Sequence, residues 1–256
     1  LGAYLKETQI LGSIQNTLYW DQNTGMPKKG ASWRSEQLTY IAKVLHKRNS
    51  SEEFSNLIQS AKNELLDSEK NSDNQFFVKD KERNINLLVK EFNRERNLDP
   101  KLVESLAKAK SKGYESWQEA KKKSDFKLFL PFFEELVKLR IEEAKQISDQ
   151  YSPWETLAQP FEPELTLKWL NKLFQPLKET IPELTRGINQ SKKNHWNLSP
   201  ESQKNLCSKL LDEFGRDKDL VIVGKSPHPF SITLGPNDFR ITTRIVEGEP
   251  LSSFLA

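Results

Sequence analysis

Apolar residues recur every three or four positions along the chain as far as Gly215, a spacing typical of amphipathic helices. The stripes run through residues 4–18, 38–45, 54–65, 76–92, 102–117, 131–147, 165–174 and 206–214. Residues 21–30 separate the first two stripes and contain Gly25, Pro27 and Gly30, which disfavour a helix interior. We therefore expect a helical hairpin closed by a loop at residues 21–30, followed by further helices.

Local signals mark where two of these helices begin. Ser50 and Glu53 have the spacing of a capping box, in which each side chain bonds the other residue's backbone N–H. Asp99 precedes Pro100, which combines a capping residue with proline at the first helical position. We expect helices to start at both places.

The strongest amphipathic pattern begins at Pro131 and divides the segment into two faces. The face expected to pack inward carries Phe133, Val137, Arg140, Ala144 and Ile147. The face expected to stay largely wet carries Glu134, Glu135, Lys138, Glu142 and Glu143.

The hydrophobic period changes from about 3.6 to 2 beyond Gly215, as expected for strands. Short β-rich runs occupy residues 220–223, 230–234 and 239–246, and a turn cluster at residues 235–238 separates the last two. The pattern predicts a small antiparallel sheet. We expect a mainly α protein with a helical N-terminal region, residues 1–219, and a small β-sheet segment, residues 220–256.

Composition narrows the class of protein further. The chain of 256 residues has a mean hydropathy of −0.71, yet its 14 Phe and 6 Trp supply the apolar surface of a folded protein. Its 39 basic and 36 acidic residues nearly cancel, which predicts neither a nucleic-acid partner nor a membrane partner. Cys207 is the single cysteine, so an intrachain disulfide is impossible and a reducing, cytoplasmic location is expected.

Polar residues alternate with apolar ones along the last predicted strand. Asp238, Arg240, Thr242 and Arg244 share one face, where the arginine forks could hold a carboxylate. The alternative is an exposed strand face stabilised by neighbouring carboxylates. His228 lies between Pro227 and Pro229, which restrict its backbone, so its ring could orient a ligand or serve only the turn.

No segment of the sequence has the spacing of a known catalytic motif. The histidines, His46, His195 and His228, are far apart, and no His-Glu-x-x-His segment places two of them on one helix face with a glutamate. Phosphate-binding loops and Gly-x-Ser-x-Gly elbows are also missing. We therefore assign no catalytic and no metal-binding residue to this sequence.

Several motifs, in this order, resemble the carboxypeptidase Taq family of zinc metallopeptidases. They are Tyr19-Trp20-Asp21-Gln22-Asn23-Thr24-Gly25-Met26-Pro27 with Gly30, Arg34 and Gln37; Asp125-Phe126 with Pro131; Phe161-Glu162-Pro163; Pro227-His228-Pro229-Phe230; and Asp238-Phe239-Arg240-Ile241-Thr242. Glu164 stands where the family usually has glycine. The resemblance covers essentially the whole chain.

The resemblance implies an incomplete half of a larger helical, cleft-containing metallopeptidase fold, in which the sheet edges the zinc site. It implies homo-oligomers, homodimers in particular, acting on peptide C-termini, with the zinc ligands and the water-activating glutamate beyond Ala256. Zinc is then expected in the complete protein and not on this chain. The substrate-binding residues expected here are His228, Asp238, Arg240, Thr242 and Arg244.

Two functions from different classes follow. The first is the N-terminal portion of a metal-dependent carboxypeptidase, inactive alone. The second is a non-catalytic helical module that binds peptides or proteins. A His-Glu-x-x-His segment in the coding sequence after Ala256 would favour the first, and an immediate stop would favour the second. Without the second half of the fold, apolar helix faces would be exposed and would favour self-association.

Overall fold

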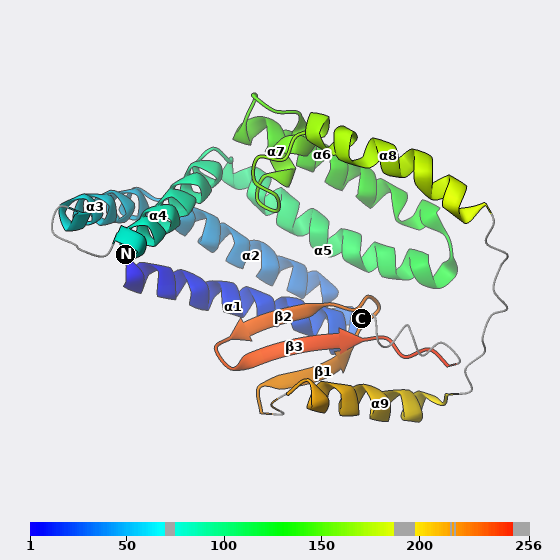
Figure 1. The fold of residues 1–256 in the computed structure, drawn as a ribbon. Helices are drawn as coiled ribbons and strands as arrows, with labels where there is room; N and C mark the ends of the chain where they lie inside the picture. The colour runs from blue at the N-terminus through cyan, green and yellow to red at the C-terminus, as the bar shows by residue number, and fades with distance from the viewer. Residues whose placement is uncertain (70–74, 187–197, 216, 218, 248–256) are drawn as a thin grey trace. The chain divides into compact units, whose positions relative to one another are not determined.

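The computed structural model describes residues 1–69, 75–186, 198–215, 217 and 219–247 (Figure 1). It divides into two compact units. The first unit is Leu1–Ile147 with Thr233–Pro236, and the second is Ser148–Ile232 with Asn237–Ala256. The boundary at residue 147 coincides with the end of the apolar stripe 131–147, before the next stripe begins at residue 165.

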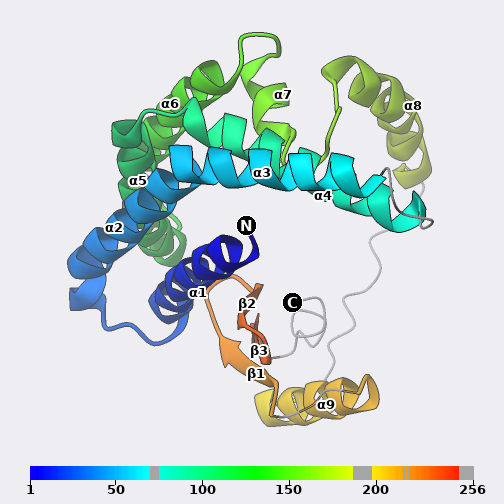
Figure 2. The same cartoon turned by 90° about the vertical axis from the view of Figure 1, so that its left-hand side faces the viewer.

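The first unit is helical. Its elements are α1 (Gly2–Thr24), η1 (Lys28–Gly30), α2 (Ala31–Asn49), α3 (Glu52–Glu69), α4 (Gln75–Arg96), α5 (Pro100–Lys123), η2 (Phe126–Leu128) and α6 (Leu130–Ile147). Helix α2 packs against α1 and α5, α5 packs against α6, and α3 pairs with α4. Helix α2 lies between α1 and α5 within this unit (Figure 2). None of the helices in the described ranges, in either unit, is long and apolar enough to span a membrane.

Two apolar clusters form the core of the first unit. One joins α1, α3 and α4 through Tyr4, Phe54, Ile58 and Phe92. The Phe54 ring stacks on Tyr4 at a centroid distance of 5.2 Å and meets Phe92 edge-on at 6.0 Å. The other cluster surrounds the start of α5 and receives side chains of α6: Leu98, Leu102 and Leu106, with Val103, Leu136, Leu139 and Ile147 packed against them. Aromatic stacking thus joins α3 and α4 to α1, and leucine burial fixes α6 on α5.

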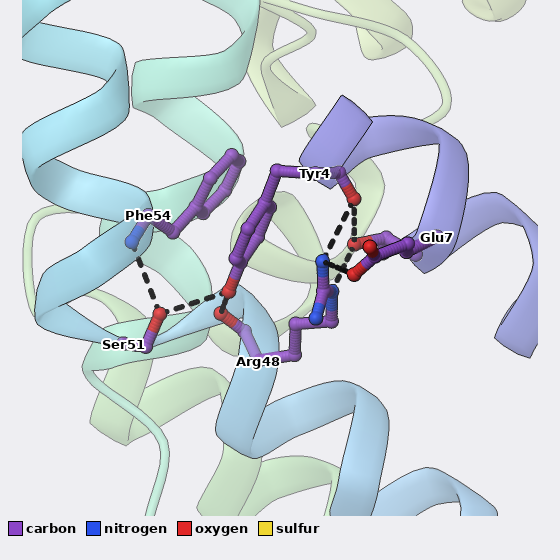
Figure 3. A network of polar contacts seen from close by, with 6 residues as sticks. Tyr4, Glu7, Arg48, Ser51 and Phe54 are labelled. Atoms are coloured by element: carbon purple, nitrogen blue, oxygen red, sulfur yellow. Dashed lines mark hydrogen bonds and ion pairs between the residues drawn. The ribbon is translucent and has the colours of Figure 1, made fainter. Parts of the chain in front are cut away.

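A polar network fixes the start of α1 to the end of α2 (Figure 3). The Arg48 guanidinium lies over the Tyr4 ring, 3.7 Å from its centroid, and donates to the Tyr4 carbonyl at 3.0 Å and to Glu7 at 2.8 Å. In return the Tyr4 hydroxyl donates to the Arg48 carbonyl at 2.7 Å and lies 2.9 Å from the Ser51 hydroxyl. Arg48 thus donates to a carbonyl of α1, and the Tyr4 hydroxyl in turn caps a carbonyl in the last turn of α2.

Of the two predicted helix starts, one agrees with the structure and the other differs by one residue. The Asp99 side chain accepts a 2.7 Å bond from the Lys101 N–H, and Pro100 is the first residue of α5, as predicted. The cap of α3 is Ser51, whose hydroxyl accepts from the Phe54 N–H, whereas the predicted Ser50 hydroxyl donates back to the His46 carbonyl.

The predicted loop at residues 21–30 is shorter than expected. Helix α1 continues to Thr24, because the Asp21 carbonyl accepts from the N–H groups of both Gly25 and Met26. The loop between α1 and α2 is therefore confined to Gly25 and the two residues after it, and η1 begins at Lys28. The hairpin itself is present.

The buried face of α6 is rotated from the predicted one. Ala144 is 1% exposed as expected, but Phe133 and Val137 are 43% and 41% exposed. Glu143, expected in solvent, is only 7% exposed. The inward apolar side chains include Leu136, Leu139 and Ile147, so Glu143, four residues from both Leu139 and Ile147, falls between two core residues and needs a partner there.

The second unit contains helices and most of the sheet. Its elements are α7 (Pro153–Ala158), α8 (Leu167–Thr185), α9 (Pro200–Glu213), β1 (Val221–Lys225), β3 (Asp238–Thr243) and the start of β2 (Ser231–Gly235), of which Thr233–Gly235 belong to the first unit. Both views place α9 beside β1 (Figures 1 and 2). Gln203 of α9, completely buried, donates at 2.9 Å to the Val246 carbonyl beyond β3.

The described strands form one sheet in the order β1-β3-β2. β1 pairs with β3 in parallel, with Val221 opposite Phe239 and Lys225 opposite Thr243. The prediction of a wholly antiparallel sheet is therefore wrong. The alternation of side chains defines a strand but not the direction of its neighbour.

Candidate functional site

The segment 226–230 is held against β3 by one buried threonine. Thr242 is 0% exposed, and its hydroxyl accepts from the Phe230 N–H at 2.8 Å and lies 2.7 Å from the Ser226 hydroxyl. The Thr242 N–H also donates to the Phe230 carbonyl at 2.8 Å. These contacts fix both ends of the turn on the same residue.

His228 lies at the middle of this turn. The Ser226 hydroxyl donates to the His228 carbonyl at 2.6 Å, and the flanking prolines, Pro227 and Pro229, fix φ on either side. The imidazole is exposed to solvent. The backbone is thus set by internal bonds, and the ring is presented at the surface.

Asp238 and Arg240 form a two-point ion pair on β3. Arg240 donates through Nε to one carboxylate oxygen and through a terminal nitrogen to the other at 2.9 Å. The hydrogen bond from Arg240 lowers the pKa of the Asp238 carboxyl, and the same bond raises the pKa of the guanidinium. A ligand carboxylate would therefore share Arg240 with Asp238.

Four of the five predicted site residues form two pairs in the structure, and the fifth, Arg244, lies apart from both pairs. The structure brings His228 and Thr242 together through the turn, and it pairs Asp238 with Arg240. Arg244 lies just past the end of β3 and is exposed. The Thr242 hydroxyl is engaged by the turn. Of the five residues, a ligand can therefore reach the charged side chains of β3 and Arg244 and the His228 ring.

The Asp238–Arg240 pair predicts a small loss of stability in acid. The folded-state pKa of Asp238 lies below its usual value, so the ion pair stabilises the fold fully when the pH is above the usual pKa. This stabilisation is lost as the pH falls through the lowered pKa. The Asp238 side chain is 39% exposed, so solvent screening limits the effect to under about 1 kcal/mol. Urea unfolding of wild type and Asp238→Asn should give a difference that shrinks toward zero as pH is lowered. A difference that stays constant with pH would contradict this assignment.

The block at residues 19–37 also has a structural role in the first unit. Arg34, with a side chain 12% exposed, donates to the Leu18 carbonyl at 2.6 Å, to Asp21 at 2.7 Å and to Gln37 at 3.0 Å. One guanidinium therefore ties α2 to the last turns of α1, across the loop that joins them.

Sequence reasoning missed a group of charged side chains, several of them buried, on α2, α4 and α6. Glu143 contacts Arg140 at 2.5 Å and Arg94 at 3.8 Å, and His46 lies 3.0 Å from Glu95. Burial lowers the pKa of Arg94. The signal in the sequence is the spacing of Glu143, four residues from both Leu139 and Ile147.

No three His, Cys, Asp or Glu side chains in the described part of the chain gather as ligands for a metal ion. His195 lies outside the described residues. The described side chains therefore do not fit a zinc site, which needs three or four such donors around one point.

Comparison with known proteins identifies relatives over nearly the full chain. Carboxypeptidase 1 of Bacillus subtilis is 30% identical over 237 residues, which cover 90% of this chain and 45% of the relative. Thermostable carboxypeptidase 1 of Thermus thermophilus is 28% identical over 259 residues, covering 95% of this chain and 49% of the relative. A crystal structure named BsuCP superposes with a TM-score of 0.86 at 28% identity, over 98% of this chain and 50% of that one.

These likenesses place the chain among the metallopeptidases. It belongs to the carboxypeptidase Taq (M32) family, because the family model of Carboxypeptidase Taq (M32) metallopeptidase matches residues 1–256. The chain spans about half the length of the curated relatives that it matches. Its mainly helical fold with a small sheet is the fold of one half of these proteins.

Proposed function

We propose that this chain is the N-terminal portion of a metal-dependent carboxypeptidase that hydrolyses residues from the C-terminal ends of peptides. The observation that carries the proposal is the family match over residues 1–256, with relatives that are named carboxypeptidases. A non-catalytic binding module has no specific observation in its favour. Peptide substrates follow from the family.

The substrate-side residues in this proposal are His228, Asp238, Arg240, Thr242 and Arg244. The exposed His228 ring and the charged groups of Arg240 and Arg244 would contact the peptide. Asp238 orients Arg240 through their two-point pair, and Thr242 acts through the turn that it holds. Planar guanidinium groups suit the recognition of a peptide carboxylate.

Zinc is the metal proposed for the complete protein. A bound zinc ion supplies a polarised carbonyl and an activated water in peptide hydrolysis. The described residues offer no donor set for it, so no step of the reaction is assigned to their side chains. This portion alone is proposed to be inactive.

A cytoplasmic location and homo-oligomers are also part of the proposal. The use of a single cysteine supports a reducing compartment. Helix α8 supports association, since its large apolar side chains are exposed: Leu167, Trp169, Leu173, Phe174, Leu177, Ile181 and Leu184. An apolar row of this length on one helix is typical of a surface that packs against another chain or segment.

Two preparations test the proposed function. The chain alone, incubated with zinc and a peptide ending in leucine, should release no residues. A chimera that joins this chain to the remaining half of the Bacillus subtilis relative should release them one at a time, with that relative as the positive control. Tight stoichiometric zinc and activity in the chain alone would refute its inactivity. A folded, zinc-loaded chimera without activity would refute the proposed function.

A further inference from the structure

The chain just after β3 carries Arg244, and the backbone is held by a buried side chain on either side of it. The pairing of β3 with β1 ends at Thr243, so Arg244 lies beyond the last pair of the ladder. Two residues before Arg244, buried Thr242 is hydrogen-bonded through both its N–H and its hydroxyl. Two residues after Arg244, the Val246 carbonyl accepts a 2.9 Å bond from the side chain of Gln203. Arg244 therefore lies between two fixed points.

The second of these points depends on one buried amide of α9. Gln203 is 0% exposed, and its Nε2 donates to the Val246 carbonyl at 2.9 Å and to the Leu198 carbonyl, just before α9, at 3.1 Å. An amide nitrogen has two protons, so these two bonds use both of them. The chain beyond β3 is thus tied to the start of α9, and removal of the amide takes a donor from two carbonyls at once.

Anchors on both sides matter more for Arg244 than for a buried residue. Its side chain is exposed, so burial of its own side chain does not fix its position. A backbone held two residues away in both directions keeps few of its conformations. An arginine on such a backbone loses less freedom when it binds a ligand, which favours binding.

We propose that Gln203 is a positioning residue for substrate recognition, which holds the backbone from which Arg244 contacts the peptide. Gln203 is completely buried, so it acts through the Val246 carbonyl and not by touching the substrate. The inference rests on the proposed function, in which Arg244 is a substrate-side residue. It gives α9 a part in the site that the turn at residues 226–230 does not supply.

Backbone relaxation measured by NMR on this chain tests the anchor. In wild type the amides of Arg244 and Ile245 should have order parameters near ~0.85, the value of rigid backbone. Gln203→Met keeps the length of the side chain but loses both protons, and should lower these values below about 0.6 while β3 stays ordered. Asn205→Met introduces the same side chain at an exposed position of α9 and should change neither. Low order in wild type, or unchanged order in folded Gln203→Met, would refute the anchor without reference to activity.

Kinetics of the chimera with the Bacillus subtilis half separate positioning from general stability. Arg244→Gln and Gln203→Met should each raise KM about three- to tenfold and leave kcat within about twofold, because substrate binding is what they weaken. In the Arg244→Gln background, Gln203→Met should raise KM by less than about twofold more, since both changes act through one contact. A merely structural residue would lower kcat through the folded fraction and leave KM unchanged.

An effect of Gln203→Met on kcat alone, or KM effects that multiply in the double variant, would overturn the positioning role. A folded, zinc-loaded wild-type chimera without activity would instead refute the proposed function, and the order parameters would still decide whether Gln203 holds the backbone at Arg244.

Discussion

Replacement of Phe54 by alanine is expected to lower the free energy of unfolding by about 3–5 kcal/mol, the usual cost of removing a buried aromatic ring. Phe54 is 4% exposed and touches rings on two other helices, Tyr4 of α1 and Phe92 of α4. Its loss leaves a cavity at the point where α3 joins the rest of the first unit. The cavity cannot close without moving α1, which Arg48 holds in place.

Chemical unfolding followed by circular dichroism measures this effect. Leu66→Ala is the control, because Leu66 is on the same helix and is 57% exposed, so its removal should change the unfolding free energy by less than about 0.5 kcal/mol. Similar losses for the two variants would show that the α1–α3–α4 cluster does not stabilise the unit.

Replacement of Thr242 by valine should destabilise the second unit by about 1–3 kcal/mol, because it leaves a backbone N–H without its acceptor. Valine has nearly the shape of threonine, so packing is preserved while the bonds to Ser226 and Phe230 disappear. The ends of the turn that carries His228 are then no longer fixed by the hydroxyl.

Hydrogen exchange at the Phe230 amide and equilibrium unfolding measure the change. Exchange at this amide should be faster in Thr242→Val, and Thr242→Ser, which keeps the hydroxyl, should retain most of the protection. If valine and serine behave alike, the hydroxyl does not hold the turn.

The sequence predicts helices and strands well where one local signal decides the structure. Asp99 and Pro100 start α5 because the cap and the fixed φ act within two residues of each other. The capping-box spacing at Ser50 was misleading, since Ser51 is the better placed acceptor for Phe54. A capping box does occur at Ser152 and Glu155.

Features that depend on distant parts of the chain could not be predicted in this way. Buried Glu143 pairs with Arg94 of α4 as well as with Arg140 of its own helix, and no local pattern contains the contact between the two helices. The parallel pairing of β1 with β3 depends on the path of the chain through β2. In the candidate site, alternation places Thr242 beside Arg240 and Arg244, but only the folded turn at residues 226–230 reveals that its hydroxyl is engaged.

The parallel pairing of β1 also constrains the order of events during synthesis. Val221 pairs with a residue later in the chain, Phe239, so β1 emerges from the ribosome before its partner strand does. Until then its backbone groups are unpaired, and Ile222 and Val223 lie in a short β-prone run that other nascent chains can join. Until β3 also emerges, β1 should therefore be more prone to pair with another chain than it is after the sheet has formed.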